Sequence, residues 1–587
     1  MAFGETEMAR ELEADPPGTI PRFADWLVYL GIAACSLLSA LVGAYRTDAD
    51  TVAYLDLSDA MRDYNWHSAI NSYWFPLYPC LLTVARGLFG FRAQYDLMAA
   101  RLLDAVLNLF FVLATVVLAA SVRRYLVSIG AEKDALLPRR TLSLWVAVAA
   151  FFLASLDLLN PTADALVSIF MILTLAALFR ALAGSTTPGW IAMGLCAGLA
   201  FWAKAFAFPF FCLLILLAAL AQWRRPSILI RLALAVAVFG VIAAPLVWQI
   251  SALRGRLTFG DSGRLNMAWS VNGADRFNPV NNTSTWQAGS AIASLKHPGE
   301  LLSKSPSISY YGGANSFGST PQFTDTAYWF DGLGSRFVLR QSLAAIKLNL
   351  VVLGSIVVMR LQVGMLCVLL GVWSFRIRRE SFANPVVCVA FALALGSIGL
   401  YASVCLVPRY ITFALGILAA VYAASSLARK PVRYPFPLHG AVLISAGLVL
   451  CFLLQGTLRE WKEARLEGSR PLEGIYSLAV HSAAVQLGSL YPRGSEVACM
   501  GDAACWGDPG WVHQAGMRMT AIVETGNGSV NVSAETGCGK LALNPAAPDA
   551  LRRKNVRAIV ARFDGTQACS AEWKPLGASP NFFYLPL

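Results

Sequence analysis

The feature that most constrains this chain is a series of long apolar stretches separated by short polar ones. A helix needs roughly 20 mostly apolar residues to cross a bilayer. Only 14% of the residues are charged, against about a quarter in soluble domains. We therefore predict a polytopic α-helical membrane protein with about eleven transmembrane helices. The stretches lie near 26–45, 100–120, 141–157, 165–183, 189–203, 206–222, 229–249, 352–375, 384–405, 410–427 and 438–455.

Basic residues gather in every second loop between these stretches. Such loops stay on the cytoplasmic side of a membrane. We therefore expect a multi-pass protein of the plasma (inner) membrane: residues 1–25 are cytoplasmic, 26–455 form the transmembrane domain, and 456–587 lie outside the cytoplasm. The net charge of +12 then follows from topology, and we expect no nucleic-acid partner. The basic groups are Arg123, Arg124, Lys133, Arg139 and Arg140; Arg224, Arg225 and Arg231; Arg376, Arg378 and Arg379; and Arg429, Lys430 and Arg433.

Three long segments fall on the outer side: loops 46–99 and 251–345, and the tail 456–587. Long loops usually have a functional role. The second loop is rich in Asn, Ser, Gly and aromatic residues, which suit contact with a sugar or a lid but are equally compatible with a structural role.

The tail is predicted to form a small extracytoplasmic α/β domain. An even number of cysteines in an exported domain indicates disulfides, and three pairings are open. Its cysteines are Cys499, Cys505, Cys538 and Cys569; its strand-like pieces are Glu496–Met500, Met519–Val523, Val556–Ala561 and Phe582–Leu585, with a helical stretch at Ile475–Leu487.

The first outer loop carries most of the acidic residues that could do chemistry. Apolar residues recur at helical spacing from Ala53 to Tyr64, which predicts an amphipathic helix near the membrane surface. Asp56, Asp59 and Asp63 fall on another face, which we expect to be solvated.

Two further aspartates, Asp48 and Asp50, stand at the start of this helix. One interpretation is helix capping, because an Asp side chain accepts backbone N–H bonds there. The other is a carboxylate that removes the proton of a hydroxyl nucleophile. The local sequence leaves both open.

A wider pattern favours the second interpretation. Asp50 precedes Tyr54 by four residues, and the helix is followed by Pro76-Leu-Tyr-Pro79, where the chain turns back into the bilayer. This arrangement resembles the GT-C superfamily of membrane glycosyltransferases, in particular bacterial members related to protein O-mannosyltransferases and aminoarabinose transferases. The resemblance implies a polyprenyl-phosphate sugar as donor and a catalytic aspartate in the first outer loop. It implies Asp50 as the best match and Asp48 as the second.

Other short elements resemble the same families. Asn160-Pro-Thr-Ala-Asp164, with Asp157 just before it, is similar to a Pro-x-x-Asp pattern, so Asp164 or Asp157 is either a second active-site acid or a helix cap. Lys204 ends Gly198-Leu-x-x-x-x-Lys, Arg409 lies in Pro-Arg-Tyr, and Arg101 opens the second apolar stretch. These cations either bind the donor phosphate or only reach the interface.

The resemblance implies a hexosyl- or pentosyltransferase that inverts the anomeric centre. The acceptor would be a hydroxyl on a glycan, lipid or protein outside the cytoplasm. Asp48, Asp50 and Asp164 could supply oxygen ligands to a divalent metal, and the sequence does not decide whether one is used. Two alternatives remain: a transporter or flippase of lipid-linked glycans, and a membrane anchor that displays the tail as a binding module.

Overall fold

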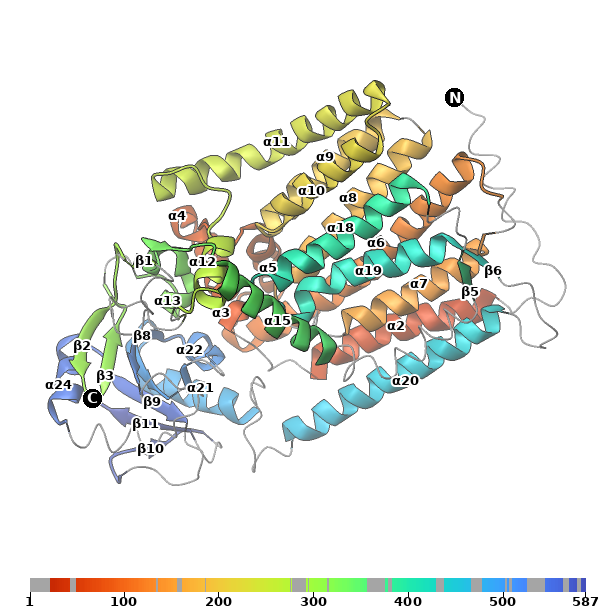
Figure 1. The fold of residues 1–587 in the computed structure, drawn as a ribbon. Coiled ribbons are helices and arrows are strands. Elements are labelled where there is room, and N and C mark those ends of the chain that lie inside the picture. The colour runs from red at the N-terminus through yellow and green to blue at the C-terminus, as the bar shows by residue number, and fades with distance from the viewer. Residues whose placement is uncertain are drawn as a thin grey trace.

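The computed structural model shows a bundle of long helices with a mixed sheet packed against one end (Figure 1). It describes residues 22–587 apart from 43–48, 133–135, 156–160, 185, 275, 277–291, 294, 314–315, 356–374, 378–382, 429–437, 466–477, 502–503, 506–508, 525–543, 563–569 and 578–581.

Every predicted apolar stretch except 352–375 coincides with a helix, and that exception lies largely outside the described residues. Five helices (α2, α6, α8, α11 and α18) are long and apolar enough to cross a membrane, and several shorter apolar helices pack among them. The bundle helices are α2 (Arg22–Val42), α6 (Asp96–Ser128), α7 (Arg139–Ala154), α8 (Asp164–Gly184), α9 (Thr187–Ala203), α10 (Ala207–Ala221), α11 (Pro226–Arg254), α15 (Leu339–Ser355), α18 (Pro385–Ala402), α19 (Pro408–Ala424) and α20 (Leu438–Arg465).

Close packing of two bundle helices explains part of the Gly198–Lys204 element. A Cβ at Gly194 would lie 2.4 Å from the carbonyl oxygen of Ala235, and one at Gly198 would lie 2.5 Å from Ile242 Cγ2. Both neighbours belong to α11, so the two glycines let α9 and α11 approach closely, as small residues four apart do in membranes. The glycine of this element is therefore required by packing.

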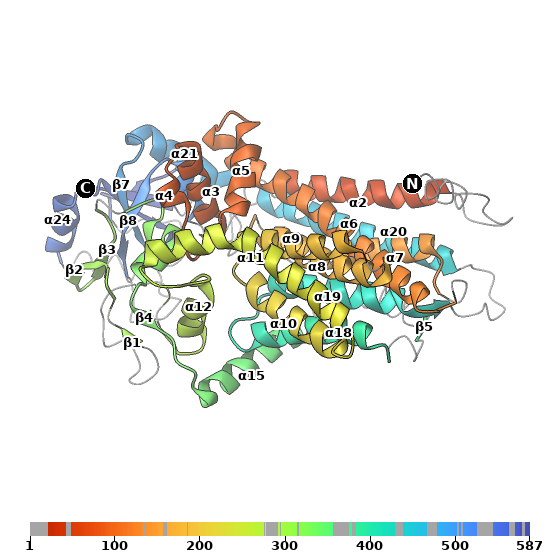
Figure 2. The same cartoon turned by 90° about the horizontal axis from the view of Figure 1, so that it is seen from above.

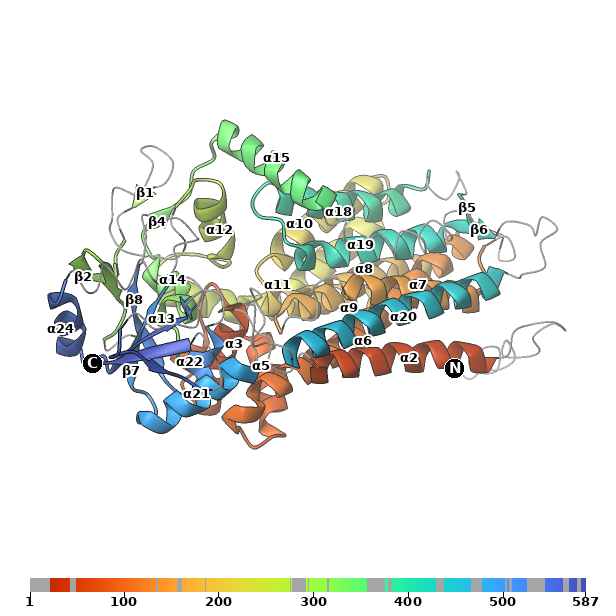
Figure 3. The same ribbon diagram turned by 90° about the horizontal axis from the view of Figure 1, so that it is seen from below.

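Short elements from the two outer loops gather at the same end of the bundle as the sheet (Figures 1 and 3). The opposite end holds the two-stranded pair β5 (Phe375–Ile377) and β6 (Ser426–Ala428) (Figure 1). The loop elements are α3 (Ala49–Arg62), α4 (Trp66–Ala69), α5 (Leu77–Gly87), η1 (Ala93–Tyr95), α12 (Ser262–Ser270), α13 (Pro321–Thr324), α14 (Thr326–Trp329), β1 (Ile292–Ala293) and β4 (Leu333–Gly334).

The sheet at this end is composite. Its strand order is β10-β11-β9-β7-β8-β3-β2, in which β7 pairs in parallel with β8 and β9 and the other pairs are antiparallel. Strands β2 and β3 come from the second outer loop, so this loop and the tail share one sheet. The strands are β2 (Glu300–Lys304), β3 (Ser307–Tyr310), β7 (Glu496–Met500), β8 (Arg518–Val523), β9 (Ala558–Arg562), β10 (Lys574–Pro575) and β11 (Phe582–Pro586).

Helices cover both faces of this sheet, as the prediction of an α/β tail requires. Alternate residues of β9 enter two cores: Ile559 packs in the core that includes Leu551 of α24 (Ala546–Arg553), and Val560 packs in the core that includes Leu487 of α21 (Leu478–Leu490). The predicted tail strands are confirmed to within about two residues at each boundary. Cys499 and Cys505 form a disulfide, while Cys538 and Cys569 lie outside the described residues.

The first-loop helix is more buried than its sequence suggests. In α3 most residues are buried, including Asp56, which is 3% exposed. The expectation of a solvated acidic face is therefore wrong for Asp56, and it is right only for Asp63, whose side chain is 61% exposed. The physical reason is that the sheet domain and the second outer loop pack over α3, which a local pattern does not reveal.

Candidate active site

Four charged side chains predicted from separate motifs meet at the sheet end of the bundle. Arg409 Nη2 lies 2.5 Å from Asp50 Oδ2, and Arg409 Nε lies 3.2 Å from Asp164 Oδ2. Lys204 pairs with the other oxygen of Asp164. The result is a chain of alternating charges, Asp50–Arg409–Asp164–Lys204, which we call the charge relay cluster.

The helix ends explain why these residues meet. Asp50 lies in the first turn of α3 and Asp164 begins α8, where the positive end of each helix dipole favours a carboxylate. Lys204 follows the last residue of α9, where a cation is favoured. Arg409 lies at the start of α19, which disfavours a cation, and the two carboxylates offset this cost.

The charge relay cluster is only partly buried. The exposed side-chain fractions are 16% for Asp50, 11% for Arg409, 23% for Lys204 and 5% for Asp164. The two carboxylates and two cations balance in charge. More than a tenth of the side chain remains exposed to water in Asp50, Arg409 and Lys204. Such pairs can exchange partners at lower cost than fully buried ones.

Aromatic rings surround the charge relay cluster. Lys204 Nζ lies 4.1 Å from the centre of the Tyr410 ring, and Tyr410 stacks on Tyr401. Tyr54 follows Asp50 by one helical turn; burial and the nearby charges of Asp164 and Asp50 raise its pKa well above the usual value. The Asp-x-x-x-Tyr spacing therefore places the phenol beside both carboxylates.

The second outer loop adds a cation that the sequence analysis missed. Arg276 is exposed over the whole residue, while its guanidinium, 5.6 Å from the centre of the Trp269 ring, lies among groups that partly desolvate it. Desolvation alone would lower the pKa of Arg276, but its interactions with Tyr73 and Asp50 raise it. Tyr73 in turn packs against Trp269, with ring centroids 5.9 Å apart. No spacing in the sequence links these residues, because they come from two loops.

Tight contacts hold the two outer loops together beside this cluster. Trp74 Nε1 donates a hydrogen bond to the carbonyl oxygen of Phe323 (2.8 Å), and Asn71 Nδ2 donates to that of Thr324 (3.2 Å). Thr51 Oγ1 donates to the carbonyl oxygen of Pro161 just before α8 (3.1 Å). These bonds fix the start of α3 against the transmembrane bundle and the second loop.

The remaining predicted residues differ in their outcome. Asp48 and Asp157 lie outside the described residues. Arg101 is buried in α6 and interacts with Tyr78, whose hydroxyl donates to Asp104 (3.3 Å). A role for Arg101 in phosphate binding therefore remains only a prediction.

The described residues do not fit a divalent metal between Asp50 and Asp164. The guanidinium of Arg409 lies between the two carboxylates and contacts both. A metal ion there would have to displace this cation, and two carboxylates alone supply few of the six or more oxygen ligands that hard cations take. We derive no step through a metal.

Comparison with known proteins shows the fold. Neither a protein-family model nor a curated relative matches the chain. Among solved structures, ArnT from Cupriavidus metallidurans bound to undecaprenyl phosphate aligns with a TM-score of 0.53 at 12% identity, covering 96% of this chain and 98% of ArnT. Its apo form gives 0.51 at 11% identity over 96% and 97%. An Archaeoglobus fulgidus oligosaccharyltransferase aligns over 92% of this chain and 70% of its own, at 11% identity, with a TM-score of 0.46.

ArnT is an aminoarabinose transferase with the GT-C fold. The resemblance predicted from the first outer loop is thus confirmed at the level of architecture: this chain has the fold of the GT-C membrane glycosyltransferases.

Proposed function

We propose that this chain is a membrane glycosyltransferase that moves a sugar from a polyprenyl-phosphate donor to a hydroxyl group outside the cytoplasm. The observation that carries the proposal is the charge relay cluster, in which an outer-loop carboxylate shares one site with two cations from transmembrane helices. Its similarity over nearly the whole length to ArnT, which has been solved with undecaprenyl phosphate, supports the same donor class.

The cations bind the donor phosphate. Lys204 and Arg409 stand at ends of apolar helices, at the level where the phosphate of a lipid with its tail in the bilayer would lie. Arg409 can hold phosphate oxygens through two N–H groups. Arg276 approaches from the second loop and adds a third positive charge to the side that faces water.

Asp50 is the general base. In the described state Arg409 pairs with Asp50 and makes it a weak base, since a nearby cation stabilises the ionised carboxylate. When a phosphate binds Arg409, this pair opens and the Asp50 carboxylate accepts the proton of the acceptor hydroxyl. Asp164 stays with Lys204 and keeps the second cation in place.

The transfer is a single displacement. The acceptor oxygen loses its proton to Asp50 and forms a bond to the anomeric carbon, while the bond from that carbon to the phosphate oxygen breaks. Lys204 and Arg409 stabilise the negative charge that develops on the leaving lipid phosphate. The anomeric centre inverts.

The orientation of the chain follows from the same proposal. Arg139 and Arg140 at the start of α7 and Arg225 just before α11 lie at the helix ends opposite to the charge relay cluster, so cytoplasmic basic loops place the cluster, the second outer loop and the tail outside. The N-terminus is then cytoplasmic, and the enzyme resides in the plasma (inner) membrane.

The test uses the full chain in lipid nanodiscs with a panel of undecaprenyl-phosphate pentoses and hexoses labelled in the sugar. We expect release of undecaprenyl phosphate that depends on an added acceptor. Asp50→Asn should lower this rate by about 100- to 10,000-fold, as loss of a general base does, without changing the melting temperature. Asp63→Asn is the matched control, because Asp63 lies at the exposed end of the same loop helix and pairs only with the surface residue Arg62 among the described contacts.

Full activity of Asp50→Asn would remove Asp50 as the base. A purified protein that moves labelled lipid between leaflets of a vesicle without releasing lipid phosphate would be a flippase, and the transferase proposal would fail.

A further inference from the structure

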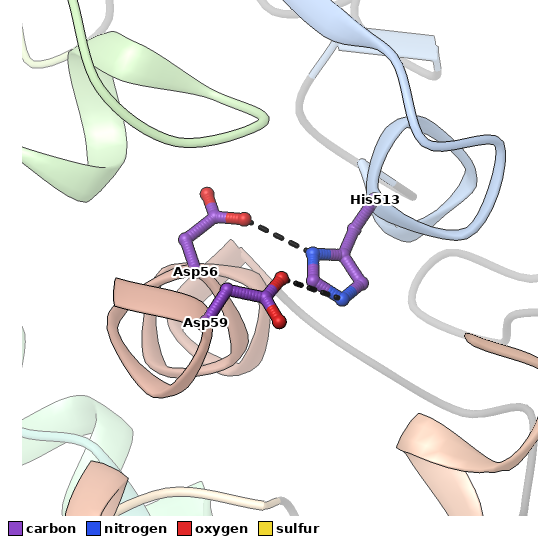
Figure 4. A group of neighbouring side chains, drawn as sticks. All are labelled: Asp56, Asp59 and His513. Atoms are coloured by element: carbon purple, nitrogen blue, oxygen red, sulfur yellow. Dashed lines mark hydrogen bonds and ion pairs between the residues drawn. The ribbon is translucent and has the colours of Figure 1, made fainter. Parts of the chain in front are cut away.

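A second cluster of charged side chains lies on the side of α3 that faces the tail, and the proposed reaction does not use it. His513 belongs to α22 (Gly510–Gln514) of the tail and is 8% exposed. Its Nδ1 lies 3.0 Å from Asp56 Oδ1, and its Nε2 lies 3.3 Å from Asp96 Oδ2 and 3.9 Å from Asp59 Oδ2. Figure 4 shows the imidazole inserted beside the two aspartates of α3.

Asp56 connects three distant segments. While Oδ1 faces His513 of the tail, Oδ2 accepts hydrogen bonds from the backbone N–H (2.8 Å) and hydroxyl (3.0 Å) of Ser319 and from the hydroxyl of Thr324 (2.6 Å). A Cβ at Gly318 would lie 2.6 Å from Oδ2, and Gly318 has φ = 85°, which favours glycine. The second loop can therefore approach Asp56 this closely only with glycine there.

Arg86 of α5 completes this cluster and is only 1% exposed. It donates to Asp96 through Nε (2.8 Å) and Nη2 (2.8 Å), to Asp59 through Nη2 (2.9 Å), and to Ser58 and the backbone of Leu55 through Nη1. We call Asp56, Asp59, Asp96, Arg86 and His513 the α3 lock.

The charge balance of the α3 lock requires a protonated histidine. The α3 lock holds three carboxylates: Arg86 pairs with those of Asp59 and Asp96, and Arg62 adds one cation at 3.0 Å from Asp59. An imidazolium supplies the third positive charge. Burial lowers the pKa of His513, but the hydrogen bonds to Asp56 and Asp96 and the charge of Asp59 outweigh it and raise the pKa to about 10.

A metal ion is the competing explanation for this cluster. Asp56, Asp59 and His513 offer ligand atoms that lie within 4.8 Å of one another. However, both ring nitrogens already face carboxylates, Asp56 Oδ2 is filled by three donors, and Asp59 binds two arginines. A metal would have to displace these cations, so the geometry favours an ion-pair network.

The α3 lock and the charge relay cluster act on the same helix from different sides. Six residues separate Asp50 from Asp56, which corresponds to about 9 Å along α3 and about 240° around it. Asp50 therefore faces Arg409 of the bundle while Asp56 faces the tail. Contacts at both positions leave α3 little freedom to rotate or slide.

We propose that His513 is a positioning residue through which the tail domain holds α3, and with it Asp50, in the geometry needed for transfer. This inference rests on the proposed function for its kinetic consequence and on the contacts alone for its structural consequence. The tail thus contributes a residue to the active enzyme rather than being only an appended domain.

The experiment compares His513→Gln, which removes the charge, with His513→Lys, which keeps it, in the full chain. Misplacing a catalytic group by about 1 Å can cost about a hundredfold in rate, so we expect kcat of His513→Gln to fall by about ten- to a hundredfold with donor KM within twofold. His513→Lys should recover most of kcat. His481→Gln is the matched control: His481 lies in the same domain and hydrogen-bonds to Gln514 (2.5 Å).

Hydrogen exchange of residues 49–62, followed by mass spectrometry, gives a readout that needs no activity. We expect faster exchange in His513→Gln and wild-type exchange in His513→Lys and His481→Gln. If His513→Gln kept the wild-type kcat and the wild-type rate of hydrogen exchange, the positioning role of His513 would be overturned. An equal loss of kcat in His513→Gln and His513→Lys would overturn it as well. If exchange responds as expected while the wild-type protein transfers no sugar, the lock stands and the proposed function fails.

Discussion

The charge relay cluster and the α3 lock are built from the same residue types and differ in access to water. In the charge relay cluster, the side chains are 5–23% exposed. In the α3 lock, four of the five side chains are 1–6% exposed and only Asp59, at 20%, lies in the range of the other cluster, and Arg86 makes five hydrogen bonds. Figure 2 shows α3 at the junction of the sheet and the bundle, where the two clusters meet.

Because of this difference, the charge relay cluster can exchange its ion-pair partners, whereas the α3 lock keeps the same partners. An ion pair near water can exchange a carboxylate for a phosphate at modest cost, while a buried network loses several favourable contacts when one member leaves. The helix α3 therefore has a replaceable contact at its first turn and permanent ones further along.

Arg86→Gln should produce the largest loss of stability. The buried carboxylate of Asp96 and the partly exposed one of Asp59 would each lose a partner, and breaking a buried pair costs about 3–5 kcal/mol. We expect a large fall in the midpoint of thermal unfolding in detergent. Arg409→Gln is the comparison, because it removes a cation that also touches two carboxylates but remains partly exposed. If Arg86→Gln and Arg409→Gln lowered the midpoint of thermal unfolding equally, the two clusters would not differ in their contribution to stability.

Arg409→Gln should instead weaken binding of undecaprenyl phosphate. A hydrogen bond to a charged group contributes about 1.5–3 kcal/mol, which corresponds to about ten- to a hundredfold in affinity. Lipid binding can be followed by native mass spectrometry of the nanodisc-extracted protein. If Arg409→Gln left the affinity for undecaprenyl phosphate unchanged and Arg86→Gln lowered it, the phosphate would bind at the α3 lock and not at the charge relay cluster.

A further effect concerns the pH dependence of stability. The pKa of His513 is raised from 6.5 to about 10, so its contribution to stability is complete below about pH 6.5 and is lost as the pH rises toward 10. The melting temperature of the wild type should therefore fall more between pH 7 and 10 than that of His513→Gln. If the melting temperature fell equally with pH in the wild type and in His513→Gln, His513 would not carry a stabilising positive charge.

Much of this architecture follows from local sequence. Apolar length predicts the bundle helices other than α15, most of which lies before the predicted stretch 352–375, and strand-like pieces of the tail predict β7, β8, β9 and β11. Asp50, Asp164, Lys204 and Arg409 are predicted as site residues because the short elements that contain them resemble motifs of the GT-C families. Their direct contacts confirm that they meet, while their roles remain proposals.

The parts that the sequence does not reveal depend on long-range contacts. Asp56 looks like a surface residue of an amphipathic helix, and only the fold brings it to His513, which lies far away in the chain. Arg276 and the pairing of β3 with β8 likewise join segments from different outer regions. Local spacing carries no information about partners of this kind.

Donor binding in the proposed reaction requires the charge relay cluster to open and accept a lipid phosphate. A cryo-electron microscopy structure of the full chain with undecaprenyl phosphate tests it directly. We predict a phosphate within about 3 Å of Lys204 and Arg409, with Asp50 released from Arg409 and facing water. A phosphate bound elsewhere, with the Asp50–Arg409 pair intact, would contradict the account.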